Sequence, residues 1–407
     1  MKILNVSYIL QNNEVISGKS IAFEKTIVKI APLDVLLQIY PDAEVIDTPA
    51  NSLVMPGLIN THVHLEFSAN KTKLKYGKFM PWLHSVIENR DDLISNCNEA
   101  CMKKETMQML RTGITTFGAI SSHGMDLGAA ANSKQNVVFF NEAIGSQATM
   151  ADALFDDFKS RLAASETINR EGFYPAIAIH SPYSVHPVLI KRAIELARSR
   201  NYPLCAHFME SPEERAWLDH NEGEFKPFFR EFLKQEYAAN TSLDFLDLFD
   251  GTPTLFTHVV HANESEYKKI KQEKHSIVHC PISNRLLGNG ALNLDTLQEH
   301  KIKWLCATDG LSSNYTLSLF EEMKIALFMH KDSDLLELAK ALLNSVTIDA
   351  AKALNLNTGE VSEGKNADLL VMELGEEACE QLPIHLILQQ YPISHRYING
   401  HFAEVNE

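Results

Sequence analysis

The sequence lacks the features that mark membrane, secreted and nucleic-acid-binding proteins. No apolar run reaches the roughly 18 residues of a membrane-spanning helix, and the first residues carry no long apolar stretch followed by a cleavage site. The chain has 37 Lys and Arg against 52 Asp and Glu, a net charge of −15, and no dominant basic block. Because a nucleic-acid binder usually presents a basic face, we expect a cytoplasmic protein that binds neither nucleic acid nor a membrane.

Cysteine is also scarce. Six cysteines occur, and none of them forms a CxxC pair, so a thiolate zinc site is not expected. Cys205, Cys280 and Cys306 lie within apolar runs and are typical of small buried residues. The HxE and PCxxC motifs of another zinc deaminase fold are missing too. These absences argue against a metal centre built on cysteine.

The two ends of the chain are rich in short segments typical of strands. Apolar or alternating segments stand near both ends, at 3–10, 20–23, 26–30, 43–47, 368–372 and 396–400. Two such ends around a long, different middle indicate one small domain made from both. We predict a β-sandwich domain that combines residues 1–55 and 360–407.

Between the ends, short apolar runs alternate with amphipathic helical stretches. Eight runs occur, at 52–64, 114–120, 136–143, 174–182, 202–210, 253–261, 275–281 and 302–310. Strands alternating with helices predict a parallel sheet, and eight strands are the number that closes a barrel. We therefore predict an α/β fold, a (β/α)8 TIM barrel over residues 56–359.

Many of these runs end in residues that can bind a metal or move a proton. They are His62, His64, His180, His207, Glu210, His258, His261, His279 and Asp309. Active sites of such barrels lie at the carboxyl ends of the strands. The coincidence predicts a catalytic barrel.

The segment NTHVH at 60–64 carries the clearest metal-binding pattern. Side chains alternate along a strand, so His62 and His64 face the same way and can chelate one cation. An exposed polar strand face is the alternative, but the preceding run 53–59 is apolar. A buried histidine pair without a metal is costly, so we interpret both as ligands.

A third and a fourth ligand are expected on later strands. His207 alone could be a satisfied core histidine, and Asp309 could cap the next helix. Beside the first pair, we interpret both as ligands of the same ion. Three nitrogens and a carboxylate suit zinc, which we expect, with iron or manganese as alternatives.

Proton transfer is assigned to residues beside these ligands. Glu210, three positions after His207, is predicted to shuttle protons. Because side chains alternate along a strand, His258 and His261, three positions apart, point to opposite faces. His258 is nearer the body of the strand, so it is the one expected to act in the site. His180 begins a loop, where it either contacts the substrate or caps the turn.

Two further groups are candidates for binding an anionic part of the substrate. Arg285 follows a tight strand-to-loop turn, and a fixed guanidinium recognises carboxylates. Ser283 and Asn284 in that turn could equally be structural hydrogen-bonders. Four lysines within 71–78 are typical of a solvated loop, and the alternative is a loop that meets an anion.

The motifs together resemble a known family. MPGLINTHVH at 55–64 resembles the opening motif of the amidohydrolase superfamily. HCPISN at 279–284 and ATDGLSSN at 307–314 are similar to the branch with triazine chlorohydrolases and purine-type deaminases. This resemblance implies one divalent metal ion per subunit, a small-molecule substrate and a homodimer.

The resemblance also carries roles onto matching residues. It implies metal binding by His62, His64, His207 and Asp309, and acid–base work by Glu210, His258 and Asp309. Candidate substrate contacts are His180, Glu66, Arg285, Ser283 and Asn314. Relatives with two metals use a carboxylated lysine on the fourth strand, and the run 174–182 has no lysine. A single metal is therefore expected.

A narrower resemblance points to one subfamily of this branch. The segments that carry it are HLEFS at 64–68, YGKF at 76–79, GAIS at 118–121, SNRLL at 283–287 and DGLSSN at 309–314. Members of that subfamily deaminate an adenine nucleoside that bears a benzoate group, on a route to menaquinone. Deamination of adenosine, S-adenosylhomocysteine or guanine is the alternative. A non-enzymatic scaffold is disfavoured, because every expected ligand is present.

Overall fold

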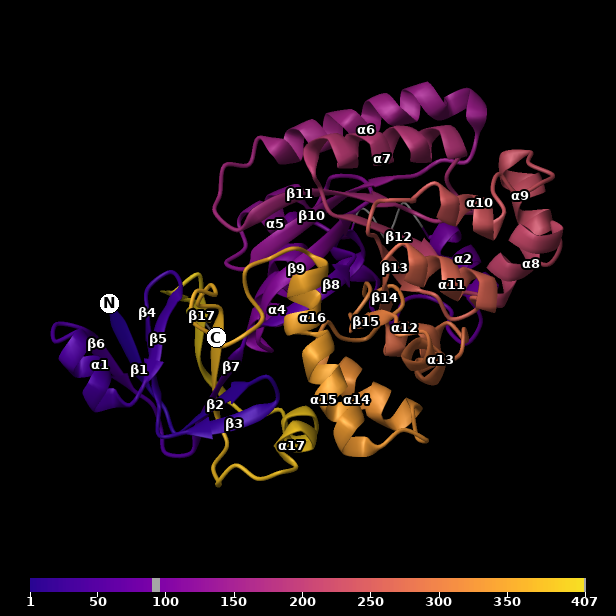
Figure 1. The fold of residues 1–407 in the computed structure, drawn as a ribbon. Helices are drawn as coiled ribbons and strands as arrows, with labels where there is room; N and C mark the ends of the chain where they lie inside the picture. The colour runs from indigo at the N-terminus through magenta and orange to yellow at the C-terminus, as the bar shows by residue number, and fades with distance from the viewer. Residues whose placement is uncertain (90–95, 406–407) are drawn as a thin grey trace.

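The computed structural model describes residues 1–89 and 96–405. The predicted barrel and sandwich ranges also include 90–95 and 406–407, which lie outside the described residues. Figure 1 shows a barrel with helices around it and a smaller β-rich part at its side, where both ends of the chain lie. The division of the chain into two domains at 55/56 and 359/360 stays a prediction.

Eight parallel strands make the barrel, and they follow one another in chain order. They are β8 (Leu58–Val63), β9 (Ile114–Ser121), β10 (Asn136–Ala143), β11 (Phe173–Ile179), β12 (Leu204–Phe208), β13 (Leu255–His258), β14 (Ser276–His279) and β15 (Lys303–Cys306). The backbone N–H of Asp309 donates to the carbonyl of His62 at 3.1 Å, which joins the last strand to the first. The predicted (β/α)8 barrel is confirmed.

The barrel strands are apolar because both of their faces are covered. Every residue of β8, β9 and β10 is buried, as expected for parallel strands with side chains packed inside and helices outside. Polar residues in these strands therefore need partners. The few buried histidines and carboxylates at the strand ends are therefore expected to have hydrogen-bond partners or a ligand.

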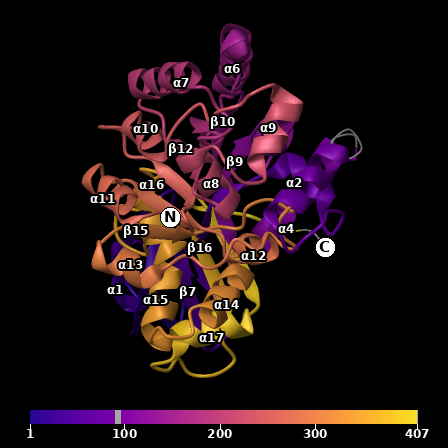
Figure 2. The same ribbon diagram turned by 90° about the vertical axis from the view of Figure 1, so that its right-hand side faces the viewer.

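Helices enclose the barrel, and Figure 2 shows them around its sides. The longer ones are α2 (Phe79–Glu88), α4 (Glu99–Arg111), α6 (Ala151–Glu166), α7 (Pro187–Arg200), α8 (Pro212–His220), α9 (Phe225–Leu233), α11 (Glu264–Gln272), α14 (Leu319–Met329) and α15 (Leu335–Ser345). Shorter ones are η1 (Leu65–Asn70), α5 (Leu127–Ala131), η2 (Ala148–Met150), α10 (Ser242–Asp247), α12 (Pro281–Leu286), α13 (Leu294–Glu299) and α16 (Ile348–Ala353). The amphipathic stretches expected between the apolar runs are thus helical, as α4, α7 and α14 show.

The small β-rich part contains two sheets. One has the order β5-β4-β1-β6, formed by β1 (Lys2–Asn5), β4 (Ser20–Phe23), β5 (Ile27–Ala31) and β6 (Glu44–Asp47). The other has the order β18-β17-β16-β7-β2-β3, formed by β2 (Tyr8–Gln11), β3 (Glu14–Ser17), β7 (Ser52–Pro56), β16 (Leu369–Glu373), β17 (Ile393–Ile398) and β18 (His401–Phe402). Leu4, Phe23, Val54 and Leu369 share one apolar core, so both chain ends build this part.

One boundary in the sequence interpretation was wrong. The run 52–64 was taken as a single strand, but it divides at Gly57 into β7, which pairs with β16, and β8, which pairs with β9. A Cβ atom on Gly57 would overlap the side chain of Thr115. The chain passes from the small part into the barrel at this crowded point. Two helices were not anticipated, α1 (Leu33–Ile39) and α17 (Leu382–Gln389).

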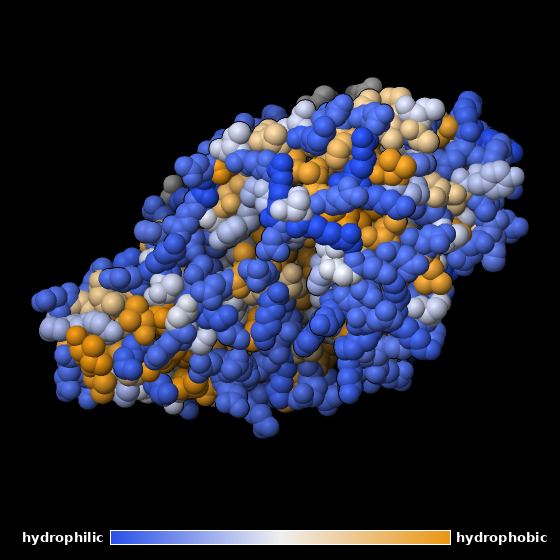
Figure 3. All heavy atoms as spheres, turned by 45° about the horizontal axis from the view of Figure 1, so that its top comes forward, coloured by the Kyte–Doolittle hydropathy of each residue, from blue (hydrophilic) through white to orange (hydrophobic). Residues whose placement is uncertain are grey.

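The surface agrees with the acidic composition. In Figure 3 most side chains on this face are hydrophilic, with apolar groups gathered in separate areas. Leu37 and Ile39 of α1 are among the exposed apolar residues of the small part. Across residues 1–89 and 96–405, no helix combines the length and apolar character needed to cross a bilayer.

Gly118 lies on β9, where this strand packs closely against β8, the strand that carries His62. A Cβ atom on Gly118 would lie 2.5 Å from the carbonyl oxygen of Thr61 on the adjacent strand. We expect Gly118→Ala to lower the free energy of unfolding by about 2 kcal/mol, because overpacking forces backbone shifts. Denaturant unfolding measures this change. Gly128→Ala is the control, because its nearest neighbour is the flexible Glu99 side chain and its site is helical; an equal loss in both variants would contradict the argument.

Candidate metal centre and active site

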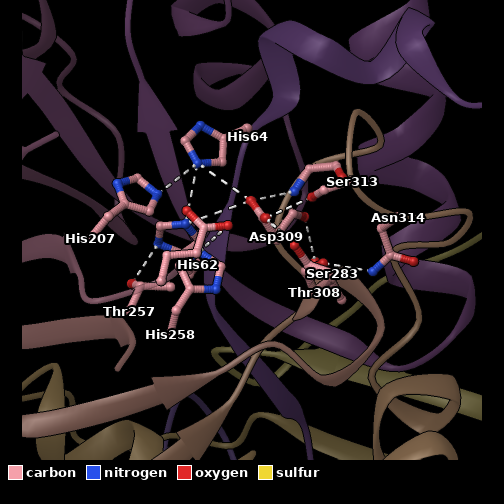
Figure 4. A network of polar contacts seen from close by, with 12 residues as sticks. His62, His64, His207, Thr257, His258, Ser283, Thr308, Asp309, Ser313 and Asn314 are labelled. Atoms are coloured by element: carbon pink, nitrogen blue, oxygen red, sulfur yellow. Dashed lines mark hydrogen bonds and ion pairs between the residues drawn. The ribbon is translucent and has the colours of Figure 1, made fainter. Parts of the chain in front are cut away.

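Three histidines from two barrel strands converge at the carboxyl end of the barrel. Nε2 of His64 lies 3.2 Å from Nε2 of His62 and 3.4 Å from Nε2 of His207. Oδ1 of Asp309 lies 3.8 Å from Nε2 of His62 and 3.5 Å from Nε2 of His64. Figure 4 shows the rings pointing toward one another with the carboxylate beside them. The residues expected as ligands are therefore together.

The spacing of these atoms fits a divalent cation. Ligands about 2.0–2.1 Å from a tetrahedral ion lie roughly 3.3–3.4 Å from each other, close to the distances between the ring nitrogens. His62, His64 and His207 also form a group whose ligand atoms all lie within 4.8 Å. The donors, imidazole and carboxylate, suit zinc and related metals.

Outer contacts orient each ligand toward the centre. Nδ1 of His207 donates to the carbonyl of His180 at 2.8 Å, and Nδ1 of His62 lies 3.2 Å from the Thr257 hydroxyl, which can accept its N–H. Both contacts leave the Nε2 lone pair for a cation. The carboxylate of Asp309 is oriented by Ser313, whose hydroxyl donates to Oδ2 at 2.6 Å.

Burial and neighbouring charge set the protonation states that ligands need. Burial lowers the pKa of His62 and of His207 well below the usual range. Burial alone would raise the pKa of Asp309, but the facing His64, His258 and His62 lower it to about 2. Burial therefore favours the neutral form of His62 and His207, and the lowered pKa favours the ionised form of Asp309, as metal binding requires.

Glu210 and His258 form a second pair next to this cluster. Nε2 of His258 lies 3.7 Å from Oε1 of Glu210, and the side-chain amide of Asn289 donates to that oxygen at 3.2 Å. The backbone N–H of Glu210 donates to the buried carboxylate of Glu214 at 2.8 Å. Burial, followed by the charge of Asp309, raises the pKa of Glu210 well above its usual range. This pair can hold and move a proton.

The backbone turns sharply where these side chains emerge. His258 has a φ of +72°, Asp309 a φ of +56° and Met209, just before Glu210, a φ of +48°. Residues other than glycine seldom adopt this left-handed region, which costs on the order of 1 kcal/mol or more. Such strain at the ends of three strands accompanies the functional side chains.

The histidines left open by the sequence are now placed. The ring of His180 lies 5.2 Å from that of His207, and its Nδ1 contacts the Ser184 hydroxyl at 2.6 Å. Burial lowers the pKa of His180 to about 4. His261 instead donates to the backbone carbonyl of Asn289 at 2.8 Å. The structure brings His258 to the cluster and directs His261 away from it.

Glu66, an expected substrate contact, is hydrogen-bonded within the protein, and its contact with a substrate stays a prediction. Its carboxylate accepts hydrogen bonds from the backbone N–H groups of Ser122, His123 and Met125, at 2.8 to 3.0 Å. Its side chain is buried. A carboxylate used in this way holds the loop between β9 and α5 and has little capacity left for a ligand.

Ser283 and Asn314 are also used internally. Ser283 donates to Oδ2 of Asp309 at 2.8 Å. The amide of Asn314 donates to the carbonyl of Thr308 and to Glu322, while its oxygen accepts from two backbone N–H groups. Both support Asp309 and its loop, and the substrate contacts expected of them stay predictions. Arg285 is exposed, and its contact with a substrate stays a prediction.

Sequence reasoning missed Glu142, the last residue but one of β10. Ser122 donates to its Oε2 at 2.6 Å, while its buried Oε1 has no hydrogen-bond partner among the described residues and lies 4.0 Å from Nδ1 of His207. Ligand atoms of Glu142, His180 and His207 lie within 4.8 Å of one another. The rule that found the other residues, a polar residue at the end of an apolar run, would have found this one.

A second hollow lies at the opposite end of the barrel. This cavity of about 660 Å³ is lined by residues such as Tyr174, Arg200, Tyr202 and Lys352. None of the clustered histidines lines it. The chemistry of the side chains therefore places the active site at the carboxyl ends of the strands.

Comparison with known proteins agrees with this geometry. Residues 53–404 match the amidohydrolase family. The chain is 45% identical over 402 residues to a protein from a Nitratiruptor species named aminodeoxyfutalosine deaminase, with 98% of each chain covered. It is 34% identical over 393 residues to a Helicobacter pylori protein named adenosine deaminase, with 95% of each covered.

The chain belongs to the amidohydrolase family. A crystal structure of Helicobacter pylori aminofutalosine deaminase in complex with methylthio-coformycin superposes with a TM-score of 0.94 at 33% identity, covering 99% of this chain and 100% of that one. The chain is therefore an enzyme of the amidohydrolase superfamily whose relatives are deaminases. The expected resemblance to the purine-deaminase branch is confirmed, and so is the narrower resemblance to aminofutalosine deaminases.

Metal content tests the assignment of the ligands. We expect His207→Asn to lose most of the bound metal, because the cluster loses one of its convergent nitrogens. His261→Asn, which removes a histidine directed away from the cluster, should keep the wild-type stoichiometry. Elemental analysis of the purified proteins gives the answer. Equal metal content in His207→Asn and the wild type would contradict the assignment.

Proposed function

We propose that this enzyme deaminates 6-amino-6-deoxyfutalosine to futalosine and ammonia, in the futalosine route of menaquinone biosynthesis. The observation that carries the proposal is the pairing of the histidine and aspartate cluster with Glu210 and His258. The 45% identity to a protein named aminodeoxyfutalosine deaminase, over nearly the whole chain, supports the choice of substrate.

We propose that His62, His64, His207 and Asp309 hold one divalent ion per subunit, with zinc as the first expectation. When bound, such an ion lowers the pKa of a water molecule toward neutrality and so supplies a nucleophile. The remaining work falls to side chains. A homodimer in the cytoplasm remains our expectation from the family resemblance.

Glu210 is the proposed proton donor to the substrate ring. Its raised pKa favours a protonated carboxyl group near neutral pH, and protonation of ring N1 makes C6 electrophilic. Water adds to C6. One of its protons restores the carboxyl group of Glu210, and the other passes to Asp309, which is ionised in the buried site. His258 orients the water with its ring nitrogen, and the proton then goes to the amine as the C6–N bond breaks, releasing ammonia.

Arg285 and the lysines of 71–78 are the candidates for binding the carboxylate of the proposed substrate. Arg285 stands near the end of α12, two residues after Ser283, which itself contacts Asp309. The N–H of Gly77 donates to the carbonyl of Leu286 at 2.7 Å, so the lysine-containing loop 71–78 packs against this helix. We propose that Arg285 pairs with the benzoate.

Deamination of adenosine is a second candidate. The Helicobacter pylori relative named adenosine deaminase is 34% identical to this chain over 95% of its length. Both substrates share the adenine ring, so the same acid–base residues would serve either of them. The residues that meet the substituent on the ribose decide between them.

Ammonia release from the metal-loaded protein tests the proposal. Aminofutalosine, adenosine, S-adenosylhomocysteine and guanine are offered in parallel, and kcat/KM is measured for each. A clear preference for aminofutalosine supports the proposal. If the enzyme prefers another base, the proposed mechanism is retained, but the proposed role in menaquinone biosynthesis is rejected.

Glu210→Gln tests the proton donor. We expect kcat to fall roughly 10²–10⁴-fold, because the amide cannot protonate the ring, while the metal content stays at the wild-type value. Glu222→Gln changes an exposed carboxylate further along the same segment and should leave kcat unchanged. Near-normal turnover by Glu210→Gln would remove this residue from the mechanism.

Arg285→Ala tests recognition of the benzoate. We expect KM for aminofutalosine to rise about 10-fold or more, the typical scale of a lost charged hydrogen bond, while KM for adenosine hardly changes. Arg230→Ala removes another exposed arginine and serves as the control. An equal effect of Arg285→Ala on both substrates would exclude a role in recognising the carboxylate.

A further inference from the structure

A line of polar side chains leads away from the active site through the wall of the barrel. Nδ1 of His258 lies 2.9 Å from Oδ1 of Asn284, and Nδ2 of Asn284 lies 3.4 Å from Nδ1 of His279. Nε2 of His279 lies 3.1 Å from Nε2 of His330, which is half-buried. The other three residues are buried, so their hydrogen bonds form without competition from solvent.

The amide in this line has a fixed polarity. Its oxygen only accepts hydrogen bonds and its NH₂ group only donates them. His258 must therefore carry its proton on Nδ1 to donate to Asn284. His279 must present an unprotonated Nδ1 to the same amide, and it then carries its proton on Nε2 and donates to His330.

The fold holds Asn284 in place. It lies on α12, which begins just after His279, the last residue of β14. The backbone N–H of Asn284 donates to the carbonyl of Cys280 at 2.9 Å, and its carbonyl accepts from the N–H of Asn289 at 2.9 Å. The N–H of Ile282 donates to the buried carboxylate of Glu322 at 3.0 Å. Rotation of the Asn284 amide would set its NH₂ group against His258 and its oxygen against the lone pair of His279.

We propose that Asn284 is a positioning residue that, together with His279, fixes His258 as the tautomer with its proton on Nδ1 and an unprotonated Nε2 facing the active site. The inference rests on the proposed function, in which His258 orients the water. Nε2 of His258 faces Oε1 of Glu210 at 3.7 Å and can accept a hydrogen bond from water or from a protonated Glu210. An amide does not relay protons, so the line orients His258 and is not a proton path.

The tautomer matters because each of the two rings can donate at only one nitrogen in its neutral form. Burial lowers the pKa of His279 well below its usual range, and burial also lowers the pKa of His258. A neutral imidazole has one donor and one acceptor, and the hydrogen bond at one nitrogen decides which group the other presents. Ser283, adjacent to Asn284, holds Asp309 in the same turn.

The tautomer can be observed in the zinc-loaded protein with ¹⁵N-labelled histidine. Two-bond ¹H–¹⁵N correlations distinguish Nδ1–H from Nε2–H rings, and the spectrum of His258→Gln identifies the resonances of His258. We expect the Nδ1–H form in the wild type. Asn284→Leu keeps the size of the side chain but removes the acceptor, so the Nδ1–H form should no longer dominate. We expect kcat to fall about 10²-fold, the scale of a misplaced acid–base group, with KM little changed.

Asn284→Asp supplies the rescue. One carboxylate oxygen can still accept from Nδ1 of His258, so the Nδ1–H form should persist and kcat should recover to within about tenfold of the wild type. His279→Leu leaves Asn284 in place but removes the lone pair that orients its amide. We expect a mixture of tautomers at His258 and a smaller fall in kcat. This variant tests the inference even where Asn284→Leu does not fold.

Asn136→Leu is the matched control for the loss of a buried asparagine. Asn136 begins β10 at the opposite end of the barrel, where its amide donates to Asp368 at 3.2 Å. We expect lower stability and an unchanged kcat. A folded Asn284→Leu that keeps the Nδ1–H form, or that keeps kcat within about twofold of the wild type, would overturn the inference. A wild type that shows the Nδ1–H form but deaminates no nucleoside would reject the proposed function alone.

Discussion

The hydrogen bond from the backbone of Asp309 to the carbonyl of His62 closes the barrel, and the position of the active site depends on it. It sets the end of the last strand beside the end of the first, so the Asp309 carboxylate meets His62 and His64. The buried side chain of Asn60 strengthens this seam, because it donates to the Thr308 hydroxyl at 2.7 Å and accepts from the Thr308 N–H at 3.2 Å. Closure of the fold and assembly of the metal centre are therefore one event.

The strand-end residues could be predicted because two simple rules act together. Parallel strands end at the same edge of a barrel, and alternate residues of a strand face the same side. These rules selected His62, His64, His207 and Asp309, which the structure brings together. The choice of His258 over His261 followed from the same counting.

The loop residues could not be predicted in this way. Glu66 was expected to meet the substrate, but its carboxylate turns back to three backbone N–H groups of a neighbouring loop. Ser283 and Asn314 likewise bond within the protein. A polar side chain in a loop can satisfy a ligand or the backbone, and the loop conformation, which the sequence does not reveal, decides between them. Glu142 was overlooked although it lies, like the others, near the end of an apolar run.

Two carboxyl groups in this site have opposite environments, and the contrast supports their separate roles. Asp309 faces several histidines, which overcome the effect of burial and keep the pKa of its carboxyl group at about 2. Glu210 accepts a hydrogen bond from the Asn289 amide, but burial, followed by the charge of Asp309, raises its pKa. Pairs of acids pushed apart in this manner divide the work of acid and base. The negative charge of Asp309 suits it to bind a cation and to accept a proton. The same charge favours the protonated form of Glu210, which can then donate its proton to the substrate.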